Sequence, residues 1–221
     1  MVATIKIASE LPPCETSTPD YWQDACKHLV KKDRVMKRLI PQFGDACLQT
    51  RGDAFVTLAR SIVGQQISVK AAQSVWDRFA QLPRTMTAAN VLKLKVDDMR
   101  LAGLSARKIE YLVDLSLHFD SGALHVNSWH SMDDDAIIAE LVAIRGIGRW
   151  TAEMFLIFHM MRPNVLPLDD IGLINGISQR YFSGEAVSRS DVREVAAAWS
   201  PYCSVATWYI WRSQDPLPVE Y

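Results

Sequence analysis

The sequence predicts an all-α protein, and three observations support this fold class. Apolar residues recur at helical spacing through nearly all of the 221 residues. No alternating apolar and polar run of convincing length is present, residues 2–7 being the one short strand candidate. Ten glycines are fewer than the ~7% average share would give, which favours helices over tight turns. Because 49% of the residues are hydrophobic, the chain can bury a sizeable core rather than remain disordered.

Capping and helix-ending residues locate the first helices. Pro41 ends the first helix, since proline lacks a backbone donor. Asp53, Ser68 and Thr87 each precede an apolar periodic segment, and their side-chain oxygens can accept from the first N–H groups of a helix. In this half of the chain the predicted helices cover residues 20–39, 54–63, 69–80, 88–92, 96–99 and 105–119.

A glycine hairpin between two predicted helices is the first candidate functional element. Ser131 is the predicted N-cap of a helix at 136–144, and three aspartates (133–135) in its first turn suit the helix dipole. The following R-G-I-G at 145–148 allows only a tight hairpin before a second helix at 149–161. Glycines allow a close backbone approach, and N–H groups at the second helix's start can bind a phosphate. Taken alone, a G-x-G pattern is more often a plain turn between core helices than a phosphate site.

A second candidate lies in the segment L-P-L-D-D at 166–170. Pro167 forces an extended approach, and Asp170 is placed to cap a helix at 171–182. Gly172 beside it leaves room for a close partner. An aspartate at a helix start is usually only a cap. This one follows the hairpin by one helix and one loop, and that linkage favours a functional role.

Composition excludes several classes of protein. No apolar run approaches the ~18 residues of a membrane span, and the first residues lack the pattern of a secretory signal. We therefore expect a soluble protein without a membrane partner, in the cytoplasm (near the nucleoid in a bacterium) or in the nucleus of a eukaryote. The cysteines lie far apart with no C-x-x-C pair, which argues against a zinc or iron–sulfur site. Reduced thiols are expected at all four: Cys14, Cys26, Cys47 and Cys203.

Charge is balanced overall but clustered locally. The formal net charge of −1 argues weakly against a general affinity for nucleic acid. Residues 27–38 nevertheless carry six cations against a single acid, Asp33. Such a run is more often a solvated helix face than a binding site, and whether it touches DNA stays open.

These segments together resemble the helix-hairpin-helix superfamily of base-excision DNA glycosylases. The string LVAIRGIGRWTAEMF, the L-P-L-D-D segment and the loop IVGQQIS at 62–68 carry the likeness, which extends from about residue 55 to residue 211. The hairpin and the aspartate pair match the alkylated-base branch, the 3-methyladenine DNA glycosylases of the second bacterial type.

The resemblance implies a two-lobed helical fold with the active-site cleft between the lobes. In this scheme residues 1–18 are an N-terminal extension and 19–215 form the glycosylase core. One lobe covers about 45–125, and the hairpin lobe covers about 126–215, packed with the N-terminal helix 20–40.

The resemblance also assigns site residues. Asp170 matches the catalytic aspartate, with Asp169 as the alternative if the alignment slips by one residue. Trp150 stands where bifunctional members carry a Schiff-base lysine, and Met154 stands where a relative has tyrosine. Trp150, Met154 and Trp211 form the implied base pocket. The implied DNA-binding residues lie in the hairpin and in the 62–68 loop: Gln65, Gln66, Ser68, Arg145, Gly146, Ile147, Gly148, Arg149 and Thr151.

Two further expectations concern side-chain roles. Gln66 lies on the loop whose tip, in the family, fills the hole left by an extruded base. The remaining tryptophans are expected to be mostly core residues: Trp22, Trp76, Trp129 and Trp199.

The implied activity is that of a monofunctional DNA glycosylase that flips alkylated purines, such as 3-methyladenine and 7-methylguanine, out of duplex DNA. A carboxylate near C1′ would stabilise an oxocarbenium-like transition state while the N-glycosidic bond is hydrolysed. Backbone N–H groups at the helix start would favour the charged form of that carboxylate. No lyase step is expected, because tryptophan cannot form an imine with the sugar.

Partners and alternatives follow from the same resemblance. Double-stranded DNA is the expected partner, the chain is expected to be a monomer, and no cofactor or metal is implied beyond a monovalent cation on the hairpin carbonyls, as in relatives. Two other functions stay open at this point. One is a glycosylase for deaminated or oxidised bases, and the other is a non-catalytic hairpin module that only grips phosphate.

Overall fold

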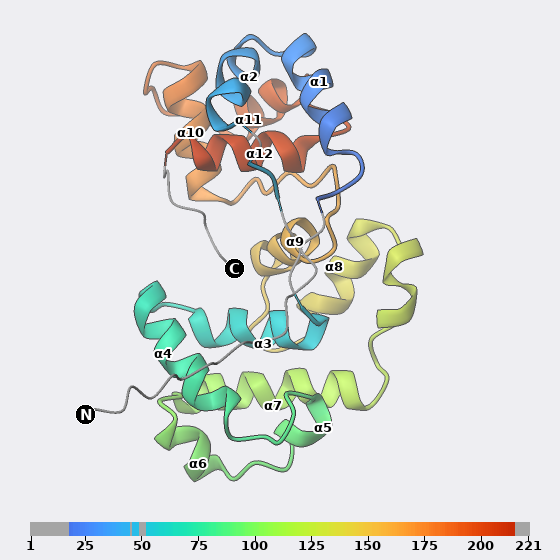
Figure 1. Ribbon diagram of the computed structural model, residues 1–221, viewed down its shortest axis with the longest axis vertical. Helices are drawn as coiled ribbons and strands as arrows, with labels where there is room; N and C mark the ends of the chain where they lie inside the picture. Colours follow the sequence, from blue (N-terminus) through green and yellow to red (C-terminus); the bar gives the residue numbers. More distant parts are fainter. Residues whose placement is uncertain (1–17, 45, 49–51, 215–221) are drawn as a thin grey trace, which may run out of the picture.

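A computed structural model describes residues 18–44, 46–48 and 52–214, which fold into a helical protein (Figure 1). Within these ranges there are α-helices and 3₁₀ helices but no strand, so the predicted all-α class is confirmed. In chain order the elements are α1 (Trp22–Lys32), α2 (Arg34–Leu39), η1 (Ile40–Phe43), α3 (Ala54–Gly64), α4 (Val69–Ala80), α5 (Ala88–Val91), α6 (Val96–Leu101), α7 (Ala106–Asp120), η2 (Val126–Ser131), α8 (Asp134–Val142), α9 (Arg149–Phe158), α10 (Ile171–Tyr181), α11 (Arg189–Ala196) and α12 (Cys203–Arg212).

The helices gather into an upper and a lower group with α8 and α9 between them (Figure 1). In the lower group α3 packs on α4 and α7, and α5 packs on α7. In the upper group α1 and α2, from the start of the chain, pack on α12 from its end, and α12 also contacts α10. The contact between α3 and α9 joins the lower group to the middle. The division into lobes at about residue 125 stays a prediction.

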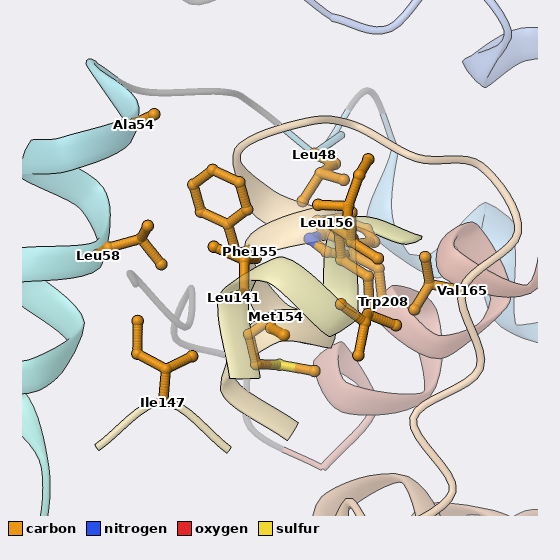
Figure 2. Packing of buried hydrophobic residues seen from close by; sticks show 14 of the residues in the cluster. Leu48, Ala54, Leu58, Leu141, Ile147, Met154, Phe155, Leu156, Val165 and Trp208 are labelled. Atoms are coloured by element: carbon orange, nitrogen blue, oxygen red, sulfur yellow. The ribbon is translucent and has the colours of Figure 1, made fainter. Parts of the chain in front are cut away.

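Buried apolar side chains connect these groups. Figure 2 shows Leu58 of α3 and Ile147 of the hairpin lying between the lower group and the α9 residues Met154 and Phe155. Leu58 and Ile147 are only 1% and 4% exposed, so the hairpin is anchored by its own isoleucine. Burial of such a side chain contributes about 1.5–3 kcal/mol, before the entropy of ordering it. The four tryptophans expected in the core are all buried there: Trp22, Trp76, Trp129 and Trp199.

The predicted helix at 20–39 is wrong as a single element. The chain breaks at Asp33, whose backbone is extended (φ −133°, ψ 123°). Its carboxylate caps α2 by accepting from Val35 and Met36 N–H, so the side chain competes with helix continuation. Pro41 does not end the helical path either. It lies in the first turn of η1, where its missing N–H costs nothing.

Two further helix boundaries differ clearly from the prediction. Asp133, not Ser131, caps α8, and Ser131 instead ends η2. The second hairpin helix ends at Phe158 rather than Met161, which has a positive φ of 54°. The structure adds α11 and α12, which the sequence analysis does not predict. The predicted caps Asp53, Ser68, Thr87 and Asp170 are confirmed, and Ser105, expected as the first residue of a helix, is the cap of α7.

Several expectations fall on or near the ends of the chain. The strand candidate at 2–7 and Cys14 lie outside the described residues, as does most of the expected extension at 1–18. Cys26, Cys47 and Cys203 are free thiols in the described part of the chain. None of the helices described is long and apolar enough to cross a membrane.

Candidate active site

Asp170 lies at the N-terminus of α10 and is buried, with 8% of its surface exposed. Its Oδ1 accepts from the backbone N–H of Leu173 (2.6 Å) and from Trp211 Nε1 (2.7 Å). Its Oδ2 accepts from Trp150 Nε1 (2.8 Å). Three N–H dipoles therefore converge on one carboxylate at the positive end of a helix, an arrangement that holds a negative charge in a fixed position.

Two glycines of α10 let α12 approach this carboxylate. A Cβ added at Gly172 would lie 3.1 Å from Asp170 Oδ1 and 3.2 Å from Trp211 Cδ1. A Cβ at Gly176 would overlap the side chain of Ile210 in α12. The absence of both side chains brings Trp211 within hydrogen-bonding distance of Asp170. The ring of Trp211 also stacks on Phe158, with centroids 5.6 Å apart and an angle of 12° between the planes.

Trp150 reaches Asp170 from the first turn of α9 and is 36% exposed. Its ring also lines a cavity of about 540 Å³ between α3, α4 and α9. The other lining residues come mainly from α3, α4 and the loop that joins them: Arg60, Ser61, Gly64, Gln65, Gln66, Ile67, Val69, Ala72, Gln73 and Thr151. Trp150 thus stands between the buried carboxylate and a cavity of ligand size.

The hairpin between α8 and α9 depends on one glycine for its shape. Gly146 has a φ of +85°, and a Cβ there would overlap the ring of Tyr111. Gly148 has a φ of −89°, and a Cβ added there would meet no other atom within 4 Å. The backbone N–H groups of Gly148 and Arg149 have no hydrogen-bond acceptor among the described residues, whereas that of Ile147 donates to Ile144. In the described part of the hairpin, the N–H groups free to bind a ligand are therefore those of 148 and 149.

The loop between α3 and α4 lies against this hairpin. Gln65 donates from Nε2 to the carbonyl of Gly146 (2.8 Å), so it fastens the loop to the hairpin. Gln66 has a positive φ of 59°, which is uncommon for a residue with a side chain and occurs at the tip of the loop. Ile67 and Val69 beside it are 40% and 81% exposed. Ser68 is occupied in capping α4.

Three other residues named in the sequence analysis, Met154, Arg145 and Asp169, do not contact Asp170 through a side-chain hydrogen bond in the described part of the chain. Met154 is 4% exposed and packed in the core, and it does not line the 540 Å³ cavity. Arg145 is exposed, and its backbone N–H donates to Asp114. Asp169, the alternative catalytic residue, is half-exposed and forms an ion pair with Arg189. Of the two adjacent aspartates, Asp170 is therefore the one held by the tryptophans.

Sequence reasoning missed two residues of this region. Phe158 supports the ring of Trp211, and Glu153, at 5% exposure, accepts from Arg149 Nε (3.0 Å). Burial raises the pKa of the Glu153 carboxyl, and the neighbouring Arg149 guanidinium acts in the opposite direction. Arg149 also pairs with Asp135, so its side chain is largely committed within the protein. The spacing of 149 and 153, one helical turn, was the available signal for this pair.

No group of three or more metal-ligating side chains occurs in the part of the chain that the structure describes. At the hairpin the carbonyl of Ile144 accepts from Ile147, and that of Gly146 accepts from Gln65. The monovalent cation at these carbonyls stays a prediction, and the chemistry proposed below does not depend on it.

The fold and the site together define a protein class. Residues 59–201 match the model of the HhH-GPD superfamily of base excision DNA repair proteins. The chain belongs to this superfamily.

Within this superfamily, the chain is similar to several individual proteins. The Bacillus subtilis protein YfjP is 32% identical over 71% of this chain, and the chain spans 57% of the length of that relative. A crystal structure of a DNA-3-methyladenine glycosidase from Bacillus halodurans superimposes with a TM-score of 0.82 at 33% identity, covering 91% of this chain and 93% of that one. The Schizosaccharomyces pombe 3-methyladenine DNA glycosylase Mag1, solved with abasic DNA, gives 0.74 at 28% identity, covering 90% and 98%.

Proposed function

We propose that this protein is a monofunctional DNA glycosylase that removes alkylated purines, of the 3-methyladenine and 7-methylguanine type, from duplex DNA. The observation that carries the proposal is the buried Asp170 carboxylate, held by Leu173, Trp150 and Trp211. One of these donors, Trp150, is 36% exposed and lines the 540 Å³ cavity, an arrangement that a plain helix cap does not need. The names of the Bacillus halodurans and Schizosaccharomyces pombe relatives support the same chemistry.

The reaction is a hydrolysis at C1′ of the sugar. The bond between C1′ and the base nitrogen breaks with its electrons leaving on the base, which becomes neutral because alkylation had made it cationic. Positive charge develops on the sugar, and the fixed Asp170 carboxylate stabilises it. Water then bonds to C1′ and gives up a proton, and the carboxylate orients that water. The N–H groups around Asp170 are in place before the reaction, so little reorganisation is required.

Discrimination in this proposal depends on charge. The half-exposed Trp150 presents an aromatic face to the 540 Å³ cavity, and Trp211 lies on the other side of Asp170. An aromatic face contributes about 1–2 kcal/mol to binding a desolvated cation. An extruded cationic purine is therefore favoured over a neutral one, and the enzyme accepts more than one alkylated base.

Duplex binding uses the hairpin and the loop at 65–68. The N–H groups of Gly148 and Arg149 bind a backbone phosphate without reading sequence. Gln66 at the loop tip enters the stack where the extruded nucleotide was, at a cost of a few kcal/mol for unstacking. The protein acts as a monomer on double-stranded DNA inside the cell, where its substrate is found.

Lyase activity is absent in this proposal because Trp150 occupies the position of the Schiff-base lysine. No hydrogen bond or ion pair joins a lysine to Asp170 among the described residues. Without an amine at C1′, no imine forms and the abasic strand stays intact.

One assay tests the whole proposal. Duplexes containing 3-methyladenine, 7-methylguanine, ethenoadenine or hypoxanthine are incubated with excess enzyme, with and without borohydride. We expect release of the first two bases, no trapped covalent adduct, and strand breakage only after alkali. Release of hypoxanthine alone would favour a deaminated-base enzyme. Binding without release of any base would favour the non-catalytic module, and a trapped adduct would contradict the monofunctional assignment.

A further inference from the structure

A strongly basic groove lies away from the carboxylate site, at the other end of α10. It has a volume of about 660 Å³, and five of its eight lining residues are cations: Lys32, Arg34, Lys37, Arg38 and Arg180. We propose that this basic groove binds backbone phosphates of the DNA duplex beside the lesion, a second contact that is independent of the hairpin.

The break at Asp33 is what gathers these cations. The single acid of the basic run turns inward, where its Oδ2 accepts from Tyr181 Oη (2.7 Å) and Trp199 Nε1 (3.0 Å). The cations before and after it, on α1 and α2, therefore line one groove instead of spiralling around one helix. The only carboxylate in the groove is 8% exposed and already accepts four hydrogen bonds.

The cations of the basic groove are not neutralised within the protein. All five side chains belong to exposed residues, and no ion pair joins any of them to an acid in the described part of the chain. The whole chain has a net charge of −1, so this local excess of positive charge is not a general property of the surface. Surfaces that only maintain solubility usually mix the two signs. Five unneutralised cations around one cavity fit an anionic partner.

The fifth cation is held in position from a third element. Arg180, near the end of α10, donates to the carbonyl of Ser213 (2.8 Å) and to its Oγ (3.3 Å), at the end of α12. This tether reduces the entropy that a free arginine would lose on binding a phosphate. A solvated surface arginine would not need it.

The geometry favours a DNA backbone as the source of phosphate. Asp170 and Arg180 lie at opposite ends of α10, about 15 Å apart at 1.5 Å per residue. Base pairs in B-DNA are spaced about 3.4 Å apart, so this length corresponds to four or five base pairs. A duplex whose extruded nucleotide is at Asp170 can then bring a phosphate within half a helical turn to the basic groove. This step rests on the proposed function, whereas the anion site itself does not.

The test neutralises three cations of the groove together: Arg34→Gln, Lys37→Gln and Arg38→Gln. The matched control removes three exposed cations on the α5 and α6 side of the molecule: Arg84→Gln, Lys93→Gln and Lys95→Gln. A third variant keeps the charge (Arg34→Lys, Lys37→Arg, Arg38→Lys). Binding to an undamaged 25-base-pair duplex is measured between 50 and 200 mM KCl, and thermal unfolding checks the fold of each variant.

We expect the groove variant to lower the salt slope of log Kd by about 2–3, since each lost phosphate contact removes about 0.9. At low salt its affinity falls roughly 10-fold or more, while the control and the charge-keeping variant stay close to wild type. Single-turnover base release at saturating enzyme is unchanged. An unchanged slope, or an equal fall in the control, overturns the proposal.

A second arm separates DNA from a free polyanion with the same phosphate chemistry. Inorganic tripolyphosphate is titrated against wild type and the groove variant, with thermal unfolding as the readout. Stabilisation that is lost in the variant, together with an unchanged DNA slope, would make the groove a small-anion site and contradict the duplex contact. Because undamaged DNA is used for binding, these outcomes remain readable even if the wild-type protein released no base.

Discussion

Asp33 and Asp170 invite comparison because their local chemistry is nearly the same. Each is 8% exposed, each caps a helix, and each accepts an indole N–H. The donors differ, however. The indole donor of Asp33 is the fully buried Trp199, and its Tyr181 donor is part-buried beside the basic groove, whereas Trp150 at Asp170 is 36% exposed and borders a cavity.

The difference shows what separates a structural carboxylate from a candidate catalytic one. Burial, a helix N-terminus and aromatic donors are common to both sites, so none of these features identifies a function. What distinguishes Asp170 is an exposed indole donor on a cavity wall, whereas the indole donor of Asp33 is fully buried and the groove beside Asp33 is lined by cations. Asp33 instead holds α2 against α10 and the turn after α11, and the charge that it removes from the surface leaves the basic groove positive.

The largest expected effect is on Asp170. Asp170→Asn retains a capping oxygen but removes the charge and places an amide N–H against the indole N–H of Trp150. We expect base release to fall by about 10²-fold or more, the cost of losing one preorganised electrostatic group. Single-turnover excision, compared at equal thermal stability, measures this loss, and binding to lesion duplex should persist or tighten.

Asp169→Asn is the matched control, because its side chain is half-exposed and pairs with Arg189. It should retain the rate of base release. Loss of activity in Asp169→Asn with Asp170→Asn still active would place the catalytic residue one position earlier. If Asp169→Asn and Asp170→Asn both remained active, Asp170 would not be catalytic, and it would differ from Asp33 only in its surroundings.

Asp33→Asn should affect folding instead of chemistry. Four donors surround this carboxylate, and the amide can satisfy them only in part. We expect the free energy of unfolding to fall by about 2–3 kcal/mol. For a chain of this size each kcal/mol corresponds to a Tm decrease of about 2–4 °C. The rate of base release per folded molecule, measured below the unfolding transition, should match that of wild type. A loss of rate without a loss of stability would contradict the structural role of Asp33.

Removing one indole N–H at each site tests the same difference between Asp170 and Asp33 with a smaller expected effect. Trp150→Phe removes a reachable N–H from Asp170, and we expect base release to slow about 10-fold with a stability change within about 0.5 kcal/mol. Trp199→Phe removes the buried donor of Asp33, and should cost about 1–3 kcal/mol of stability with no change in rate. Urea unfolding and single-turnover excision on both variants test this, and equal rate losses would argue against it.

The smallest expected effect is at the hairpin, where Gly146 is needed for the backbone conformation and Gly148 for the proposed phosphate contact. A Cβ at Gly148 meets no neighbouring atom within 4 Å in the free protein, and we expect the side chain of Gly148→Leu to cover the N–H groups proposed to bind a phosphate. Binding to damaged and undamaged duplex should weaken alike, by roughly 5-fold for about 1 kcal/mol of lost hydrogen bonding. Gly146→Ala, which forces an overlap with Tyr111, should instead lower Tm. A loss confined to one lesion in Gly148→Leu would contradict the phosphate role.

Local signals were enough to predict most of the caps, the hairpin and the position of Asp170. A side-chain oxygen before an apolar periodic segment acts over three residues, and the structure confirms four such caps, Asp170 among them, while Asp133 replaces the predicted Ser131. The role of Gly146 also follows from a short motif, since the turn requires a positive φ.

Long-range contacts were not predictable from these patterns. The break at Asp33 depends on Tyr181 and Trp199, about 150 residues away in the chain. The buried run Cys203–Ile210 covers nearly the whole of α12, so this helix has no amphipathic pattern to reveal it. Phe158 and the burial of Glu153 are likewise set by neighbours from other elements. The roles of Met154 and of the DNA-contacting side chains stay predictions.

The two glycines of α10, Gly172 and Gly176, indicate which helices of this protein can be varied by mutagenesis and which cannot. A library that randomises Gly176 would mostly yield inactive clones, because a Cβ there overlaps Ile210 and displaces α12, and with it Trp211; at Gly172 a side chain larger than that of alanine would crowd Asp170 and Trp211. Ser61, Ala72 and Thr151 on the cavity wall face no such constraint from this helix pair. To select a variant that removes a different damaged base, we would therefore randomise positions on α3, α4 and α9 and leave α10 and α12 unchanged.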